Sequence, residues 1–128
     1  MTKFLLIQHH VAMGAWTPAD VRRHYDYQTS LDADLAAAGE LVETQGLAGL
    51  SRLVTSDGAA GDDPAGAGPD RGAPAPAVCG MPVLAGYRIV DVESEERALR
   101  IAARASAAPG PGGVPLRQPI DVRRLLTP

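Results

Sequence analysis

The chain has 128 residues, a formal net charge of −3 and one cysteine, Cys79. This length predicts a single domain over residues 1–128 with a modest core, and the weakly acidic balance argues against nucleic acid or a membrane surface as the main partner. No apolar run approaches the roughly 20 residues that a membrane span requires. A lone cysteine cannot form an internal disulfide, which is compatible with a cytoplasmic protein.

The N-terminal half predicts a strand followed by a long capped helix. Residues 3–8 are predominantly apolar and predict the strand. Thr17 is a good N-cap, Pro18 suits the first helical position, and Gly39 suits the C-terminal stop, so we expect a helix over residues 18–38. Two short strands, 40–44 and 50–55, are expected next, joined through Gly46 and Gly49.

Residues 56–82 predict a mobile loop within the domain. Segment 58–82 alone holds eleven of the chain's glycines and prolines, and such a segment buries too little apolar area to offset the entropy lost on ordering. The loop is either a lid over a site or a tolerated surface insertion, and the sequence leaves both interpretations open.

The C-terminal half repeats the strand-helix-strand order. Residues 86–92 alternate as a half-buried strand does, and Ser94 is the expected N-cap of the next helix. That helix carries a small apolar stripe and an arginine face that we expect to meet water. A second flexible piece, residues 109–115, is expected to be only the link to a last strand that carries residues 120–123. Strand aspartates 91 and 121 are expected to point away from the core, where they either pair with arginines such as Arg88 and Arg123 or, if a second subunit covers that face, become buried charges that need partners.

Together these elements predict an α+β fold with the ferredoxin-like order βαββαβ and both helices on one face of the sheet. The other face of such a sheet would be bare. We therefore expect a homodimer, in which a second copy covers it.

The helix at 18–38 carries the candidate site. At helical spacing, Val21, His24, Gln28, Leu31 and Leu35 share one face, the spacing of a core-facing stripe. Two of these five side chains are polar, and a buried imidazole or amide needs a partner or a cavity. The helix therefore faces either a wet pocket near its start or, in the simpler interpretation, bulk water at an exposed end.

Two more histidines, His9 and His10, end the first strand and point to opposite faces of it. They cannot easily share one metal, but one of them should face the same interior as His24 and could transfer a proton there. The sequence does not decide which one, or whether it is simply hydrated. No motif with zinc spacing and no phosphate-binding loop is present, so we expect neither a metal nor a cofactor.

Aromatic residues surround this helix. Trp16 precedes the N-cap and either staples the helix to the sheet or forms an apolar wall of a pocket. Tyr25 and Tyr27 flank the stripe and supply either hydroxyls or packing bulk. Cys79 has no neighbouring cation in sequence to activate its thiol and is not expected to be a nucleophile.

The chain resembles a divergent member of the YCII-related family, which includes the DGPF-type proteins. The resemblance covers most of the chain outside residues 58–78 and rests on the strand at 3–7, the segment 35–42, Gly86-Tyr87 and Ile120-Asp121-Val122-Arg123. It implies a ferredoxin-like fold that pairs into a dimeric α+β barrel with a pocket in each subunit.

The family's suspected active centre joins a histidine of the first helix to the aspartate of an Asp-Gly-Pro-Phe loop, and both positions differ here. Gln28 stands at the helix position, with His24 one turn earlier. Cys79 stands at the aspartate position, within Val78-Cys79-Gly80-Met81-Pro82. The dyad therefore cannot be transferred to this chain as it stands.

These observations predict a small cofactor-independent enzyme that uses acid–base chemistry on an organic, natural-product-like intermediate: an isomerase, lyase or cyclase. His24 would be the acid or base, with His9 or His10 as second proton-transfer group. Substrate would be bound by Gln28, Tyr25, Tyr27, Trp16 and Met81. The alternative is a binding or regulatory module that holds a small molecule without turning it over.

Overall fold

The computed structural model describes residues 1–9, 15–48, 52–54, 56, 60–62 and 84–126. Its elements are, in chain order, β1 (Thr2–His9), α1 (Pro18–Ala37), β2 (Leu41–Gly46), β3 (Arg52–Val54), β4 (Ala60–Asp62), β5 (Leu84–Val92), α2 (Glu95–Ser106), a short 3-10 turn at Pro111–Gly113, and β6 (Ile120–Arg124). No helix in these ranges is long and apolar enough to cross a membrane.

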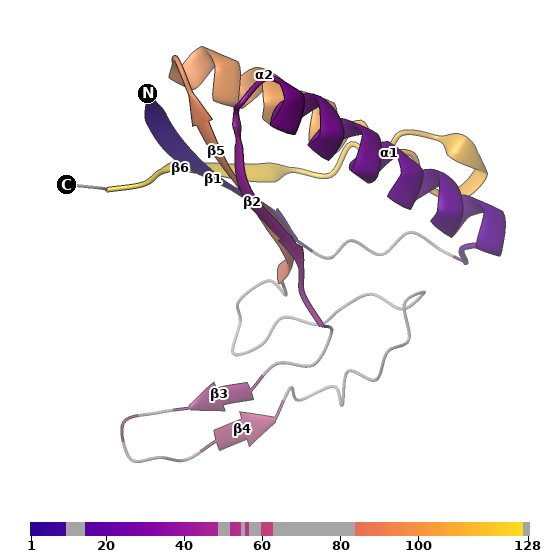
Figure 1. Cartoon of the computed structure of the whole chain (residues 1–128). Coiled ribbons are helices and arrows are strands. Elements are labelled where there is room, and N and C mark those ends of the chain that lie inside the picture. The colour runs from indigo at the N-terminus through magenta and orange to yellow at the C-terminus, as the bar shows by residue number, and fades with distance from the viewer. Residues whose placement is uncertain (10–14, 49–51, 55, 57–59, 63–83, 127–128) are drawn as a thin grey trace.

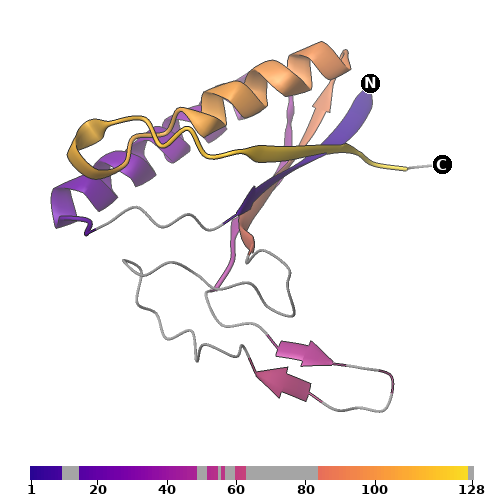
Figure 2. The same cartoon turned by 180° about the vertical axis from the view of Figure 1, so that it is seen from behind.

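Four strands form one antiparallel sheet in the order β2-β5-β1-β6, and both helices cover the same face of it (Figures 1 and 2). Each helix connects two strands that are separated in the sheet by a third strand. The predicted α+β class is confirmed, and the strand order is compatible with a ferredoxin-like fold.

The ends of α1 form where the sequence signals place them. The Thr17 hydroxyl accepts from the Asp20 amide at 3.1 Å, and the Asp20 carboxylate accepts from the Thr17 amide at 2.9 Å, a complete capping box. The helix ends at Ala37, and Gly39 follows with φ of +72°, a conformation that glycine adopts with little strain.

The core lies between the sheet and the two helices. Alternation along β1 and β5 turns every second side chain towards the helices, and small alanines let α2 approach the strands closely. The buried cluster consists of Phe4, Leu6, Leu31, Leu35, Val90, Val92, Ala98, Ile101, Ala102 and Ala105. On the opposite face Leu5, Ile7 and Ile89 remain partly exposed.

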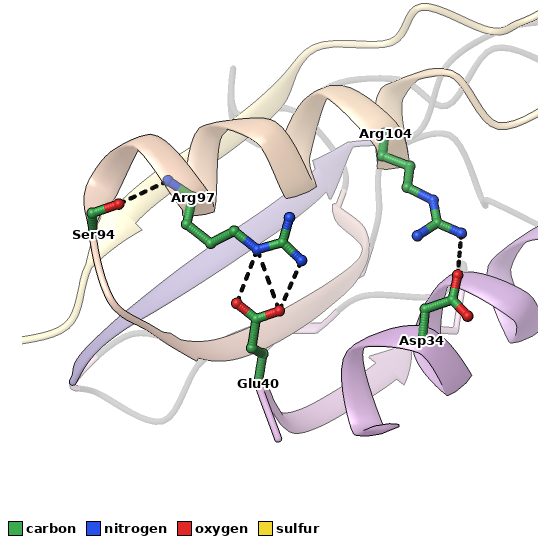
Figure 3. Close-up of polar contacts among 5 residues, drawn as sticks. All are labelled: Asp34, Glu40, Ser94, Arg97 and Arg104. Carbon is green, nitrogen blue, oxygen red and sulfur yellow. Dashed lines mark hydrogen bonds and ion pairs between the residues drawn. The ribbon is translucent and has the colours of Figure 1, made fainter. Parts of the chain in front are cut away.

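The arginine face of α2 differs from the prediction, because two of its members pair with carboxylates instead of only meeting water (Figure 3). Arg97 forms a two-pronged ion pair with Glu40, between α1 and β2, at 2.8–3.3 Å. Arg104 bonds Asp34 of α1 at 2.6 Å. The Arg97 guanidinium lowers the pKa of the Glu40 carboxyl below its usual value. Arg104 thus links α2 to α1, and Arg97 links α2 to the segment that follows α1.

Three further sequence-based expectations were wrong. The strand expected at 50–55 is the shorter β3, which pairs with β4 in a separate two-stranded sheet instead of with the main sheet. Asp121 does pair with Arg123, at 3.1 Å, but Arg88 faces the helices and not Asp91. Residues 109–115 are more than a link, because their backbone groups bond side chains of α1. The expected loop at 56–82 lies mostly outside the described residues.

Candidate functional site

The candidate site is a row of hydrogen-bonded polar side chains between α1 and β5, with half-buried His24 at its outer end. His24 Nδ1 lies 3.0 Å from the carbonyl oxygen of Pro109, in the segment that follows α2. A carbonyl oxygen can only accept, so Nδ1 carries the proton in this contact. In the neutral imidazole the other nitrogen, Nε2, is then an acceptor.

Gln28, one turn further along α1, continues the row. Its amide nitrogen lies 3.4 Å from His24 Nε2, and its amide oxygen accepts a hydrogen bond from the Arg88 guanidinium. Because arginine can only donate, the oxygen of Gln28 must face Arg88 and its NH₂ group must face His24. Every donor in the row therefore points the same way, from Arg88 through Gln28 and His24 to Pro109.

Arg88 is the buried end of the row. It projects from β5 into the space between sheet and helices, with only 4% of its side chain exposed. Its Nε donates to Asp32 at 2.7 Å, and Asp32, 26% exposed, lies one turn beyond Gln28 on α1. A buried guanidinium requires such a counter-charge, because transfer of an unpaired ion out of water is strongly unfavourable.

The segment that provides the Pro109 carbonyl is fixed to the start of α1. The Gly112 amide donates to the Asp20 carboxylate at 3.1 Å, and Arg23 bonds the same oxygen at 3.3 Å. The amide of Thr17 is the main cause that lowers the pKa of the Asp20 carboxyl, and Gly112 and Arg23 contribute in the same direction. The acceptor of His24 is thus held by an ionised capping residue of the same helix.

Aromatic rings enclose His24 on two sides. Its ring meets Trp16 edge to face at a centroid distance of 5.4 Å and Tyr25, which is 59% exposed, at 5.8 Å. Both contacts have the geometry that aromatic pairs favour. Tyr27 is placed differently, because its hydroxyl donates to the Arg104 carbonyl at 2.7 Å and joins α1 to α2.

The remaining predicted site residues do not join this row. No hydrogen bond or ring contact connects His9 with His24, although both are described. His9 follows an irregularity in the pairing of β1 with β5, and its Nδ1 is buried without a partner among the described residues. His10 and Met81 lie outside the described residues.

Sequence reasoning found His24, Gln28 and Trp16 but missed three groups that complete the row: Arg88, Asp32 and the carbonyl of Pro109. One signal was available. Residues 24, 28 and 32 repeat at four-residue spacing on one helix, and Arg88 has the same strand parity as the core residues Val90 and Val92. The Pro109 carbonyl has no side-chain signature.

The row holds the His24 ring between the Pro109 carbonyl and the Gln28 amide, with the Trp16 and Tyr25 rings against it. Within the described ranges no group of His, Cys, Asp and Glu side chains has the arrangement of a metal site. Comparisons with protein-family models and with curated proteins find no match to this chain.

Proposed function

We propose that the protein is a small cofactor-independent enzyme in which His24 transfers a proton to and from an organic substrate, in an isomerisation, elimination or cyclisation. The observation that carries this proposal is the orientation of His24. Its Nδ1–H is held by the Pro109 carbonyl, and Nε2 faces the NH₂ group of Gln28, so the contacts match a ring with its proton on Nδ1 and its lone pair on Nε2. A general base requires a free lone pair in a fixed direction and a second partner that orients the ring.

The Pro109 carbonyl also supports the charged state that proton transfer creates. When Nε2 takes a proton the ring becomes an imidazolium, and a carbonyl dipole aligned with Nδ1–H is more favourable to that cation than to the neutral ring. The Trp16 ring beside His24 supplies apolar surface against which a carbon skeleton could pack.

The YCII-like assignment and the dimeric α+β barrel belong to the same proposal. The four-stranded sheet and its strand order support them. On the face away from the helices, Leu5, Ile7 and Ile89 form a partly exposed apolar strip, and a second copy of the chain would bury it.

One observation favours the second candidate, a binding module without catalysis. Both ring nitrogens of His24 have partners within the chain, and the Arg88 charge is matched by Asp32. The polar groups of the row therefore have hydrogen-bond partners without a substrate, and the row could serve only to hold a ligand against the rings of Trp16 and Tyr25.

Base-catalysed ring opening of 5-nitrobenzisoxazole separates the two candidates, because one proton abstraction releases a coloured phenolate. We expect the protein to accelerate this reaction, and His24→Gln to lower the rate about 100-fold, in the range general-base catalysis contributes. Arg100→Gln, on exposed α2 surface, is the matched control and should retain the rate. Equal rates for wild type and His24→Gln, both folded, would remove the catalytic role of His24.

A further inference from the structure

We infer that the substrate is an enolisable carbonyl compound, and that the Gln28 amide, oriented by the buried Arg88, donates to its oxygen as the enolate forms. This inference rests on the proposed role of His24 as the base. It concerns two groups whose contact in the structure defines where a reacting molecule must sit.

The contact between Gln28 and His24 is easily exchanged. At 3.4 Å it is longer than the 2.7–3.2 Å usual for such bonds. Both side chains are half-buried and lie one turn apart on α1. A substrate that presents an acidic C–H to His24 Nε2 would displace the Gln28 amide from it. The NH₂ group, still held through its oxygen, would then face the substrate with a free N–H.

Arg88 determines what Gln28 can do after this exchange. Its guanidinium binds the Gln28 oxygen and so prevents the amide from rotating its oxygen towards the substrate. A cation at the carbonyl end also polarises the amide and strengthens its N–H as a donor. Because only 4% of the Arg88 side chain is exposed, Arg88 acts through Gln28 and is a positioning residue, whereas Gln28 would touch substrate.

An enolisable carbonyl compound fits this pair, because its acidic C–H and its oxygen are separated by one carbon atom. His24 Nε2 takes the proton as the C–H bond breaks, and the electron pair moves into a C=C bond while the C=O oxygen becomes an enolate. Gln28 N–H stabilises that oxygen as charge develops. The imidazolium then returns the proton to carbon, or a β-substituent leaves with the electron pair and takes the proton from the imidazolium. No further reactant is needed.

A strongly anionic substrate fits the row less well than a neutral carbonyl compound does, because the charges of the row are already matched. Asp32 neutralises Arg88, and the imidazole is neutral in the Nδ1–H form, so the row offers directed dipoles and no unmatched cation. Preorganised dipoles suit a charge that develops during the reaction, whereas a phosphate would require arginine or lysine contacts.

Deuterium exchange at C3 of pentane-2,4-dione in D₂O, followed by proton NMR, tests the inference. We expect the protein to accelerate exchange and His24→Gln to abolish the acceleration. Gln28→Leu, which removes the amide donor, should lower the rate about 100-fold, the effect of losing one donor to a developing oxyanion. Arg88→Met should lower the exchange rate about tenfold. Arg88→Lys should recover part of the rate, because lysine keeps the charge but lacks the planar guanidinium donors.

Each outcome decides between the two proposals. If His24→Gln abolishes exchange while Gln28→Leu and Arg88→Met retain it, the base remains and the oxyanion role is refuted. If exchange is not accelerated although the benzisoxazole opens, the substrate class is wrong. If His24→Gln changes neither reaction, the proposed function itself fails. The ultraviolet absorbance of bound enolate gives a second readout, which Arg88→Met should reduce and a purely structural role would leave unchanged.

Discussion

Replacement of Asp32 by alanine removes the carboxylate that bonds Arg88 Nε at 2.7 Å. The guanidinium left behind is 4% exposed, so water cannot replace the lost charge, and the loss should lower the free energy of unfolding by about 3–5 kcal/mol. Arg88→Met leaves the Asp32 carboxylate instead, which is 26% exposed and can be hydrated. Its effect should be smaller, about 1.5–3 kcal/mol.

The double variant gives this reasoning its sharpest test. In the double variant Asp32→Ala with Arg88→Met, the buried unpaired charge is gone. The double variant should therefore be more stable than Asp32→Ala alone, by about 1–2 kcal/mol. Urea unfolding followed by Trp16 fluorescence, at one protein concentration, measures all four proteins. If Asp32→Ala is no less stable than Arg88→Met, or if the double variant is the least stable, Arg88 is not the buried charge described here.

Other predictions concern the frame around the site. Arg97 lowers the pKa of Glu40 in the folded protein. The ion pair therefore stabilises the protein above the pKa that the carboxyl has in the unfolded chain, and this stabilisation is lost as the pH falls towards the folded pKa. Between pH 6 and 3 the wild type should lose about 1 kcal/mol more stability than Glu40→Gln. Thr17→Ala removes one half of the capping box and should lower the unfolding free energy by about 1 kcal/mol. An unchanged unfolding free energy would mean that the start of the helix is frayed and the cap is not formed. Gly39→Ala forces φ of +72° on a residue with a Cβ and should destabilise by about 1–2 kcal/mol, whereas Gly39→Asn should be milder; equal stabilities would contradict the assigned backbone. Thermal and urea unfolding measure all three.

The frame was predictable because its signals are local. A hydroxyl, a proline and a glycine fix the ends of α1 within a few residues of the chain. The alternation of residues 86–92 marked β5, and Ser94 marked α2. Pairing was less predictable, because β2 and residues 50–55 follow each other in sequence and yet β2 pairs with distant β5. Short strands pair according to tertiary packing more than to propensity.

Half of the candidate site was predictable for the same reason. His24 and Gln28 are polar members of an otherwise apolar helical stripe, and that anomaly is visible in sequence. Arg88 was expected to meet a strand aspartate, because a charge in an alternating strand is ordinarily on the solvent side. Its core position depends on Asp32, 56 residues away, and a carbonyl such as that of Pro109 has no side chain to mark it.

The central claim is that His24 is a base with its proton on Nδ1 and its lone pair on Nε2. Long-range proton–nitrogen NMR of the imidazole ring, at a pH where His24 is neutral, measures this directly. The structure predicts an Nδ1–H resonance with the proton chemical shift of a hydrogen-bonded group. It also predicts an unprotonated Nε2 whose nitrogen chemical shift changes when Gln28 is replaced by leucine. A ring with its proton on Nε2 would contradict the account, because that nitrogen could not take a proton from a substrate.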